Sequence, residues 1–103
     1  MDPRNEQIAD DYELARSYQR QAEEFRDQWM AGRAREIQYV IRRANEGDPR
    51  FKRMSEREMQ ATGRMRWSKS GQARKLAGLD EEYSRLAKIH LAFAEFQLLR
   101  ARS

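Results

Sequence analysis

One long helix-forming stretch constrains this chain more than any other feature. Pro3 and Gly47 bound a stretch of about 43 residues in which Gly32 is the one weak helix former. At about 1.5 Å per residue, such a helix would be roughly 60 Å long, whereas a compact domain of this size has a radius of gyration of about 13 Å. The helix must therefore bend at Gly32, or protrude and pack against another chain.

Both ends of this first helix carry sequence signals. Asp2 is placed to cap the N-terminus, with Pro3 at the first helical position, where its missing N–H costs nothing. Gly47 is suited to a left-handed C-terminal cap, and Pro49 prevents the helix from continuing. We expect the helix to cover about residues 3–46.

Apolar residues follow three- and four-residue spacings along this helix, but the pattern shifts by one residue near its middle. The first run is Ile8, Tyr12, Ala15, Tyr18, Ala22, Phe25 and Trp29, and the second is Met30, Ala34, Ile37, Ile41 and Ala44. A shift of one residue turns the apolar face by about 100°. The two halves are therefore expected to address different surfaces, with the change beside Gly32.

A short second helix is predicted after the Gly47–Arg53 loop. Ser55 and Glu58 have the S-x-x-E spacing of a capping box, and Met54 and Met59 occupy the two hydrophobic-staple positions. These signals predict a helix over about residues 55–66. The next break is expected at Trp67-Ser68-Lys69-Ser70-Gly71.

A third helix is predicted over about residues 71–101, with Gly78 as a kink and Asp80 as a second cap. One 3-4 repeat runs through Leu76, Leu79, Tyr83, Leu86, His90, Phe93 and Gln97, and other faces carry Ile89, Leu91, Phe96, Leu98 and Leu99. A helix that is apolar nearly all round is buried on several sides. In so short a chain, we expect a second subunit to supply part of this cover.

The composition agrees with an all-α chain. Charged residues make up 37% of it, and it has only 2 Pro and 5 Gly, which is typical of helices rather than linkers. We expect one helical domain over residues 1–103: a long N-terminal helix, a short basic middle helix and an apolar C-terminal helix in a helical hairpin or bundle, completed by oligomerisation and most simply as a homodimer. The expected core or subunit-interface residues are Tyr18, Phe25, Trp29, Ile37, Ile41, Leu79, Tyr83, Leu86, His90, Phe93, Phe96 and Gln97.

The sequence also bears on the protein's surroundings. It has no cysteine, which excludes disulfides and thiolate metal sites and favours an intracellular origin. No apolar run approaches the ~20 residues of a membrane span, and the N-terminus lacks the apolar core of a secretory signal. We expect a cytoplasmic protein without a membrane partner, and short chains of this kind are common in viruses and mobile elements.

Few residues suggest chemistry. His90 is the single histidine, and it falls in the apolar stripe seven residues before Gln97. It can act as a buried proton switch or general base, or it can form a polar pair that fixes helix register, and the second interpretation is favoured. The Glu-x-x-His signature of di-metal helices is absent, and so are phosphate-binding loops and nucleophile motifs. We expect no catalytic residues, no metal ligands, no cofactor and no enzymatic activity.

Charge is strongly segregated along the chain, whose net charge is +4. Residues 1–30 hold four Arg against eight Asp or Glu, residues 31–78 hold thirteen Lys or Arg against five, and residues 79–103 hold four of each. Such segregation indicates an electrostatic partner. The candidate residues for binding a polyanion or an acidic protein surface are Arg42, Arg43, Arg50, Lys52, Arg53, Arg57, Arg64, Arg66, Trp67, Lys69, Arg74 and Lys75.

Two interpretations of this basic segment stay open. Arginines interleaved with Phe51 and Trp67 suit phosphate contacts and base stacking in nucleic acid. Alternatively, the cations pair with the acidic first thirty residues of the same or a neighbouring chain, and the aromatic side chains pack in the core. A helix-turn-helix is excluded, because the apolar positions of its second helix are filled by polar residues. The favoured function is a non-catalytic interaction or assembly module, and the alternative is nucleic-acid binding through residues 33–75.

Overall fold

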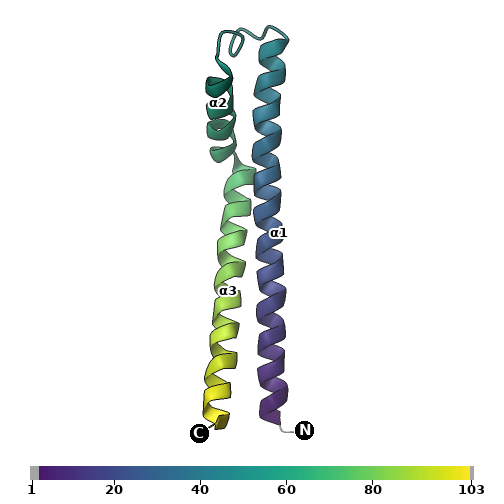
Figure 1. The fold of residues 1–103 in the computed structure, drawn as a ribbon, viewed down its shortest axis with the longest axis vertical. Coiled ribbons are helices and arrows are strands. Elements are labelled where there is room, and N and C mark those ends of the chain that lie inside the picture. Colours follow the sequence, from purple (N-terminus) through teal and green to yellow (C-terminus); the bar gives the residue numbers. More distant parts are fainter. Residues whose placement is uncertain (1–2, 103) are drawn as a thin grey trace. The chain divides into compact units, whose positions relative to one another are not determined.

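The computed structural model describes residues 3–102, which form three helices and no strand. Helix α1 spans Pro3–Asn45, α2 spans Glu56–Ser68 and α3 spans Gly71–Arg102 (Figure 1). The expected all-α class is confirmed, and each expected helix boundary lies within two residues of the observed one. The predicted cap at Asp2 lies outside the described residues.

The C-terminus of α1 ends as its sequence predicts. Gly47 has a φ of 87°, in the left-handed region that favours glycine. The Gly47 N–H donates to the carbonyl of Ala44, and the Asp48 N–H donates to the carbonyl of Arg43, both at 3.0 Å. This pair of bonds is the Schellman motif, which satisfies the last carbonyls of the helix.

The start of α2 is fixed by the predicted capping residues. The Glu58 backbone N–H donates to the Ser55 hydroxyl at 3.2 Å, and that hydroxyl donates to the Glu58 carboxylate at 3.0 Å. Met54 and Met59 are half-buried, and both pack against the same cluster of buried residues. The chain therefore enters α2 at a defined angle.

A break of two residues separates α2 from α3. The Ser70 hydroxyl accepts a bond from the Ala73 N–H at 3.1 Å and donates to the Trp67 carbonyl at 2.7 Å, so Ser70 joins the end of one helix to the start of the next. Helix α3 then continues through Gly78 and Asp80. Asp80 is not a second cap: inside the helix, its carboxylate accepts a bond from the Ser84 hydroxyl.

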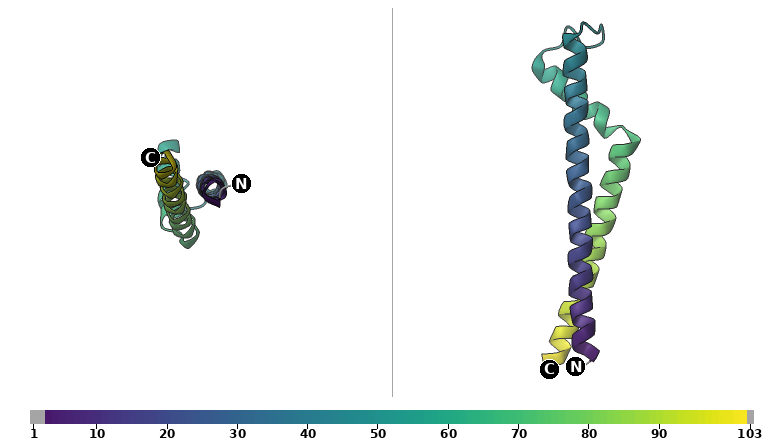
Figure 2. Two further views of the ribbon diagram at one scale, coloured as in Figure 1. Left: turned by 90° about the horizontal axis from the view of Figure 1, so that it is seen from below. Right: turned by 90° about the vertical axis from the view of Figure 1, so that its right-hand side faces the viewer.

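The chain divides into two compact units. Unit 1 comprises residues 1–25 with residues 78–103, and unit 2 comprises residues 26–77. In unit 1, the first part of α1 and the last part of α3 lie side by side and run antiparallel (Figures 1 and 2). Unit 2 contains the second part of α1, all of α2 and the first turns of α3.

Unit 1 is held together by a row of small residues beside a row of aromatic rings. Ala15 and Ala22 of α1 and Ala94 of α3 are buried, and Ile8 lies seven residues before Ala15. Next to them, Tyr83 lies 5.7 Å from the ring of Tyr18 and 5.4 Å from the ring of Phe25, centroid to centroid. Phe25 packs against Tyr83, whereas Tyr18, which comes earlier in α1, stacks on His90, which comes later in α3. This order shows that the two helices run antiparallel and sets their register.

Unit 2 depends on two glycines that allow α1 and α2 to approach closely. The six-membered ring of Trp67 occupies the space that a side chain at Gly32 would fill, and a Cβ at Gly63 would lie 2.6 Å from the Cα of Ile37. Trp67 is 5% exposed. Farther along α1, Val40 and Ala44 form a buried cluster with Phe51 from the loop.

The expected second apolar stripe of α1, which begins beside Gly32, is only partly correct: Ala44 is buried and Ile37 and Ile41 are half-buried, but the first two residues of the stripe are exposed. Helix α1 continues through Gly32, where the glycine serves as a contact surface for Trp67 rather than as a bend. Met30 is 50% exposed and Ala34 is exposed, although both belong to the predicted second stripe. The fully buried residue of this half is Val40, which the predicted stripe omits. Which side of this part of α1 is buried depends on where α2 packs. The sequence of α1 alone does not specify that position.

Candidate protein-interaction surface

The last turns of α3 expose large apolar side chains along one side. Phe93 is 54% exposed, Phe96 is 58% exposed and Leu99 is 66% exposed, with Ile89 one turn earlier at 43%. These four residues follow spacings of four, three and three, which keep them on one side of a helix. Ala94, on the side of α3 that faces α1, is completely buried. One side of this part of α3 therefore packs within unit 1, and the side with these four residues is exposed.

Leu14 of α1 adds to the same side of unit 1. On α1, Asp11 and Tyr18 contact His90 of α3. Leu14 lies three residues after Asp11 and four before Tyr18, so it is next to these two residues on the helix surface, on the side away from the buried Ala15. On α3, Phe93 lies three residues after His90, on the side away from the buried Ala94. Leu14 and Phe93 therefore both lie outside the contact between α1 and α3. We call the surface formed by Leu14, Leu86, Ile89, Phe93, Phe96 and Leu99 the apolar flank.

His90 forms a polar contact across unit 1. Its Nδ1 lies 3.1 Å from Oδ1 of Asp11, and its ring stacks on Tyr18 at 5.5 Å. An ionised carboxylate can only accept, so Nδ1 carries the hydrogen and donates it to Asp11. The expected partner Gln97 is not the one used, and Gln97 Oε1 is buried without a hydrogen-bond partner among residues 3–102. This geometry agrees with a register-fixing contact between helices.

The loop after α1 contains a buried carboxylate that binds two arginines. Asp48 accepts bonds from Arg50 through Nε at 3.2 Å, Nη2 at 2.9 Å and the backbone N–H at 2.9 Å, and from Arg43 Nε at 3.2 Å. The hydrogen bonds from the Arg50 side chain, followed by the one from its backbone N–H, hold the pKa of Asp48 well below its usual range. The pKa of Arg50 is raised in turn, mainly by its hydrogen bonds to Asp48. This cluster fixes the loop on the end of α1.

Other predicted basic residues are also used inside unit 2. Arg66 donates to the Glu36 carboxylate at 2.8 Å, and its guanidinium lies 5.6 Å from the ring centroids of both Tyr39 and Phe51. Arg64 donates to Gln60. Trp67 and Phe51 are both buried, so in this structure neither presents a face on which a base could stack. The aromatic residues of the basic segment are core residues.

The remaining candidate cations extend from the surface. They are exposed and form no ion pair within residues 3–102: Arg42, Lys52, Arg53, Arg57, Lys69, Arg74 and Lys75.

Of the expected interface residues, only Phe93 and Phe96 are exposed, and ten are half-buried: Tyr18, Phe25, Trp29, Ile37, Ile41, Leu79, Tyr83, Leu86, His90 and Gln97.

Sequence reasoning missed the roles of Asp11, Asp48 and the two buried glycines. Asp48 had a recognisable signal, because an Asp before Pro favours a turn in which its carboxylate accepts the backbone N–H two residues later. Asp11 is separated from His90 by 79 positions, so no local pattern points to the pair. Gly32 carried a signal that was interpreted as a bend.

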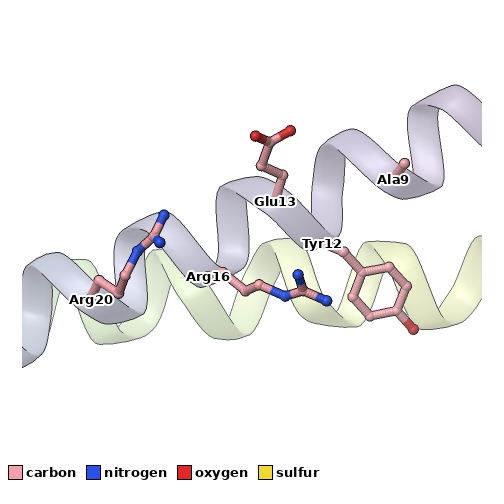
Figure 3. Close-up of a pocket in the computed structure, with 5 residues that line it drawn as sticks. All are labelled: Ala9, Tyr12, Glu13, Arg16 and Arg20. Atoms are coloured by element: carbon pink, nitrogen blue, oxygen red, sulfur yellow. The ribbon is translucent and has the colours of Figure 1, made fainter.

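A shallow hollow in unit 1 lies along α1. It has a volume of about 560 Å³ and is lined by Ala9, Tyr12, Glu13, Arg16 and Arg20. Figure 3 shows Arg16 extended toward Tyr12, while Glu13 and Ala9 point to the other side of the helix. All five residues come from one helix, and their charged groups do not converge on a common point.

Two further features of the described residues concern metal ions and membranes. Within residues 3–102, no cluster of three or more potential metal-ligating His, Asp or Glu side chains is present. None of the helices in that range has the length and apolar character needed to cross a membrane.

The comparisons with other proteins do not assign the chain to a family: no family model, curated protein or solved structure matches it.

Proposed function

We propose that this protein is a non-catalytic helical interaction or assembly module that self-associates through the apolar flank of unit 1. The observation that carries the proposal is the exposure of Phe93 and Phe96, each more than half accessible, on one side of α3. Full burial of a Phe side chain contributes roughly 1.5–3 kcal/mol, so covering the exposed part of each ring contributes on the order of 1 kcal/mol. Large apolar side chains grouped on one face are typical of interaction surfaces.

The shape of unit 1 supports this proposal. Two antiparallel helices bury only the sides that face each other, and a second pair of helices packed on the flank would complete a four-helix core. From Leu86 to Leu99, the exposed side of α3 that carries the flank is lined by apolar residues, with the exposed Arg85 just before them. The centres of protein interfaces are likewise depleted of charged residues. An adaptor, a structural subunit and an inhibitor of another protein are all members of this functional class.

The test compares aspartate substitutions inside and outside the flank. Phe93→Asp and Phe96→Asp should each weaken self-association at least about tenfold, because a charge would be buried in the contact in both subunits. Met30→Asp is the matched control, since Met30 is 50% exposed and lies in unit 2. Size-exclusion chromatography with light scattering measures the association, and circular dichroism verifies that each variant keeps its helices. Equal effects of Phe93→Asp and Met30→Asp would contradict the proposal.

A second candidate function is nucleic-acid binding by the exposed cations of unit 2. Lys52 and Arg53 in the loop and Arg57 in the first turn of α2 are close in sequence, exposed and without an ion-pair partner among the described residues. If such residues contact phosphates, log K should fall with log salt at a slope of about −0.9 per contact. Fluorescence anisotropy at two salt concentrations, with Lys52, Arg53 and Arg57 changed to Glu, tests this. Absence of binding to duplex and single strands at low salt would exclude it.

A further inference from the structure

We infer that the occupant of the apolar flank is a second copy of this chain, docked with its α3 antiparallel to the first around a two-fold axis near the level of Leu91. This inference rests on the proposed self-association and adds the orientation and the register of the two copies. It is carried by the order of charges along the exposed side of α3.

An anion, Glu82, borders the flank on α3 near its start, and a cation, Arg100, borders it near its end. Arg85, which is exposed and lies between Glu82 and Ile89, adds a second charge near the start. Glu82 lies seven residues before Ile89, and Arg100 lies seven residues after Phe93, so all four are on the same side of the helix. Glu82 is exposed and has no partner among residues 3–102. The Arg100 guanidinium lies 5.9 Å from the ring centroid of Phe96, which keeps this cation at the edge of the flank.

The positions of these residues are symmetric about Leu91. Glu82 and Arg100 are equally distant from it along the chain, and so are Ile89 and Phe93. In an antiparallel pair centred there, Glu82 faces the partner's Arg100 and Ile89 faces the partner's Phe93, and the two-fold axis repeats each contact. Opposite charges therefore meet at both ends of an apolar centre.

A parallel arrangement places like charges together. Glu82 would then face the partner's Glu82, and Arg100 would face the partner's Arg100. Like-charge contacts across an interface cost free energy and select against the wrong orientation. The same residues thus favour one arrangement and oppose the other.

Charge reversal gives a first test of this pairing. Glu82→Arg and Arg100→Glu should each weaken the dimer about tenfold, because each variant places like charges at both ends of its own homodimer. An equimolar mixture of the two variants should recover wild-type affinity. In the mixed dimer, the two substituted positions place opposite charges together in one contact, and the native Arg100 of one copy faces the native Glu82 of the other in the second contact. Weakening by each variant without recovery in the mixture would overturn the pairing.

Disulfide cross-linking then tests the orientation directly. The chain has no cysteine, so Glu82→Cys and Arg100→Cys each introduce a unique thiol. In the antiparallel dimer, equivalent thiols lie roughly 27 Å apart, beyond the reach of a disulfide, whereas a mixture of the two variants brings position 82 close to position 100. Glu95→Cys, on a different side of α3, is the matched control.

The inference predicts cross-linked dimer in the mixture of Glu82→Cys and Arg100→Cys, at least about tenfold more than in either variant alone or with the control. Efficient linkage of Glu82→Cys with itself would show a parallel pair and overturn it. A dimer by sedimentation that links in none of these combinations would overturn the register while leaving the proposed self-association intact. A chain that is monomeric in sedimentation would overturn both.

Discussion

The two compact units differ in where they place their large aromatic side chains. In unit 2, Phe51 is 3% exposed and Trp67 is 5% exposed, whereas in unit 1, Phe93 and Phe96 are more than half exposed. Unit 2 therefore buries these two aromatic residues within the chain, and unit 1 leaves two of its own exposed. The comparison separates residues that hold the fold from residues available for an interaction.

The difference has a local structural cause. In unit 2, Gly32 and Gly63 remove the side chains that would keep α1 and α2 apart, which makes room for Trp67. In unit 1, alanines occupy the centre of the contact between α1 and α3, so the aromatic residues on the outer side of α3 lie beyond the reach of α1. A contact between two helices through small residues is narrow, and it leaves the outer sides of both uncovered.

The largest expected effect compares a buried with an exposed aromatic residue. Trp67→Ala should lower the free energy of unfolding by about 3–5 kcal/mol, because it removes a buried ring and leaves a cavity beside Gly32. Phe93→Ala should cost less than about 1 kcal/mol in dilute protein, where no partner covers the ring. Urea unfolding followed by circular dichroism measures both. Similar losses for the two variants would remove the distinction between the units.

The next effect compares a glycine in a close contact with one in open space. Gly63→Ala should destabilise by about 1–3 kcal/mol, because the new Cβ meets the backbone of Ile37 and the helices must separate. Gly78→Ala has nothing within 4 Å of the new Cβ, so the higher helix propensity of Ala should stabilise by up to about 1 kcal/mol. In the same urea assay, the two variants should change the free energy of unfolding in opposite directions. A stabilising Gly63→Ala would contradict the close approach of α1 and α2.

A third test uses the pH dependence of stability, which should be specific to the Asp48 cluster of unit 2. The pKa of Asp48 lies below its usual value of 3.8, so its ionised form stabilises unit 2 above that pH, and the stabilisation is lost as the pH falls below it. Asp48→Asn should therefore lower the melting temperature at neutral pH, and its difference from wild type should shrink below about pH 4. Thermal unfolding across that pH range measures the difference. A constant difference at all pH values would show that the charge of Asp48 does not matter.

The smallest effect concerns the polar contact in unit 1. Asp11 and His90 are partly exposed, with side-chain exposures of 15% and 25%, so their coupling should be only about 0.5–1 kcal/mol. A double-mutant cycle of Asp11→Ala and His90→Ala at neutral pH measures this coupling. A coupling of zero would mean that the row of alanines alone sets the register of α1 and α3.

Local sequence signals predicted the helices but not the packing between them. Gly47, Ser55 and Glu58 act through bonds to residues within a few positions, so the helix ends could be read directly. The buried side of α1 depends on where α2 lies, which is why Val40 was missed and Gly32 was taken for a bend.

The candidate interaction surface was predicted only in part. The excess of apolar residues near the end of α3 indicated an incomplete core, and Phe93 and Phe96 were named among its residues. The sequence did not distinguish those that face α1 from those that face outward. That distinction needs the contacts of Tyr83 and His90 with α1, which involve residues far apart in the chain. The partner of the outward-facing residues stays a prediction.

Sedimentation equilibrium of the wild-type chain tests the central claim most directly. Measured from low micromolar to near millimolar protein, the average mass should rise with concentration toward that of two chains. Phe96→Asp should remain at the mass of one chain over the same range while keeping its helical circular dichroism signal. A wild-type chain that stays monomeric and fully folded at the highest concentration would contradict self-association through the apolar flank.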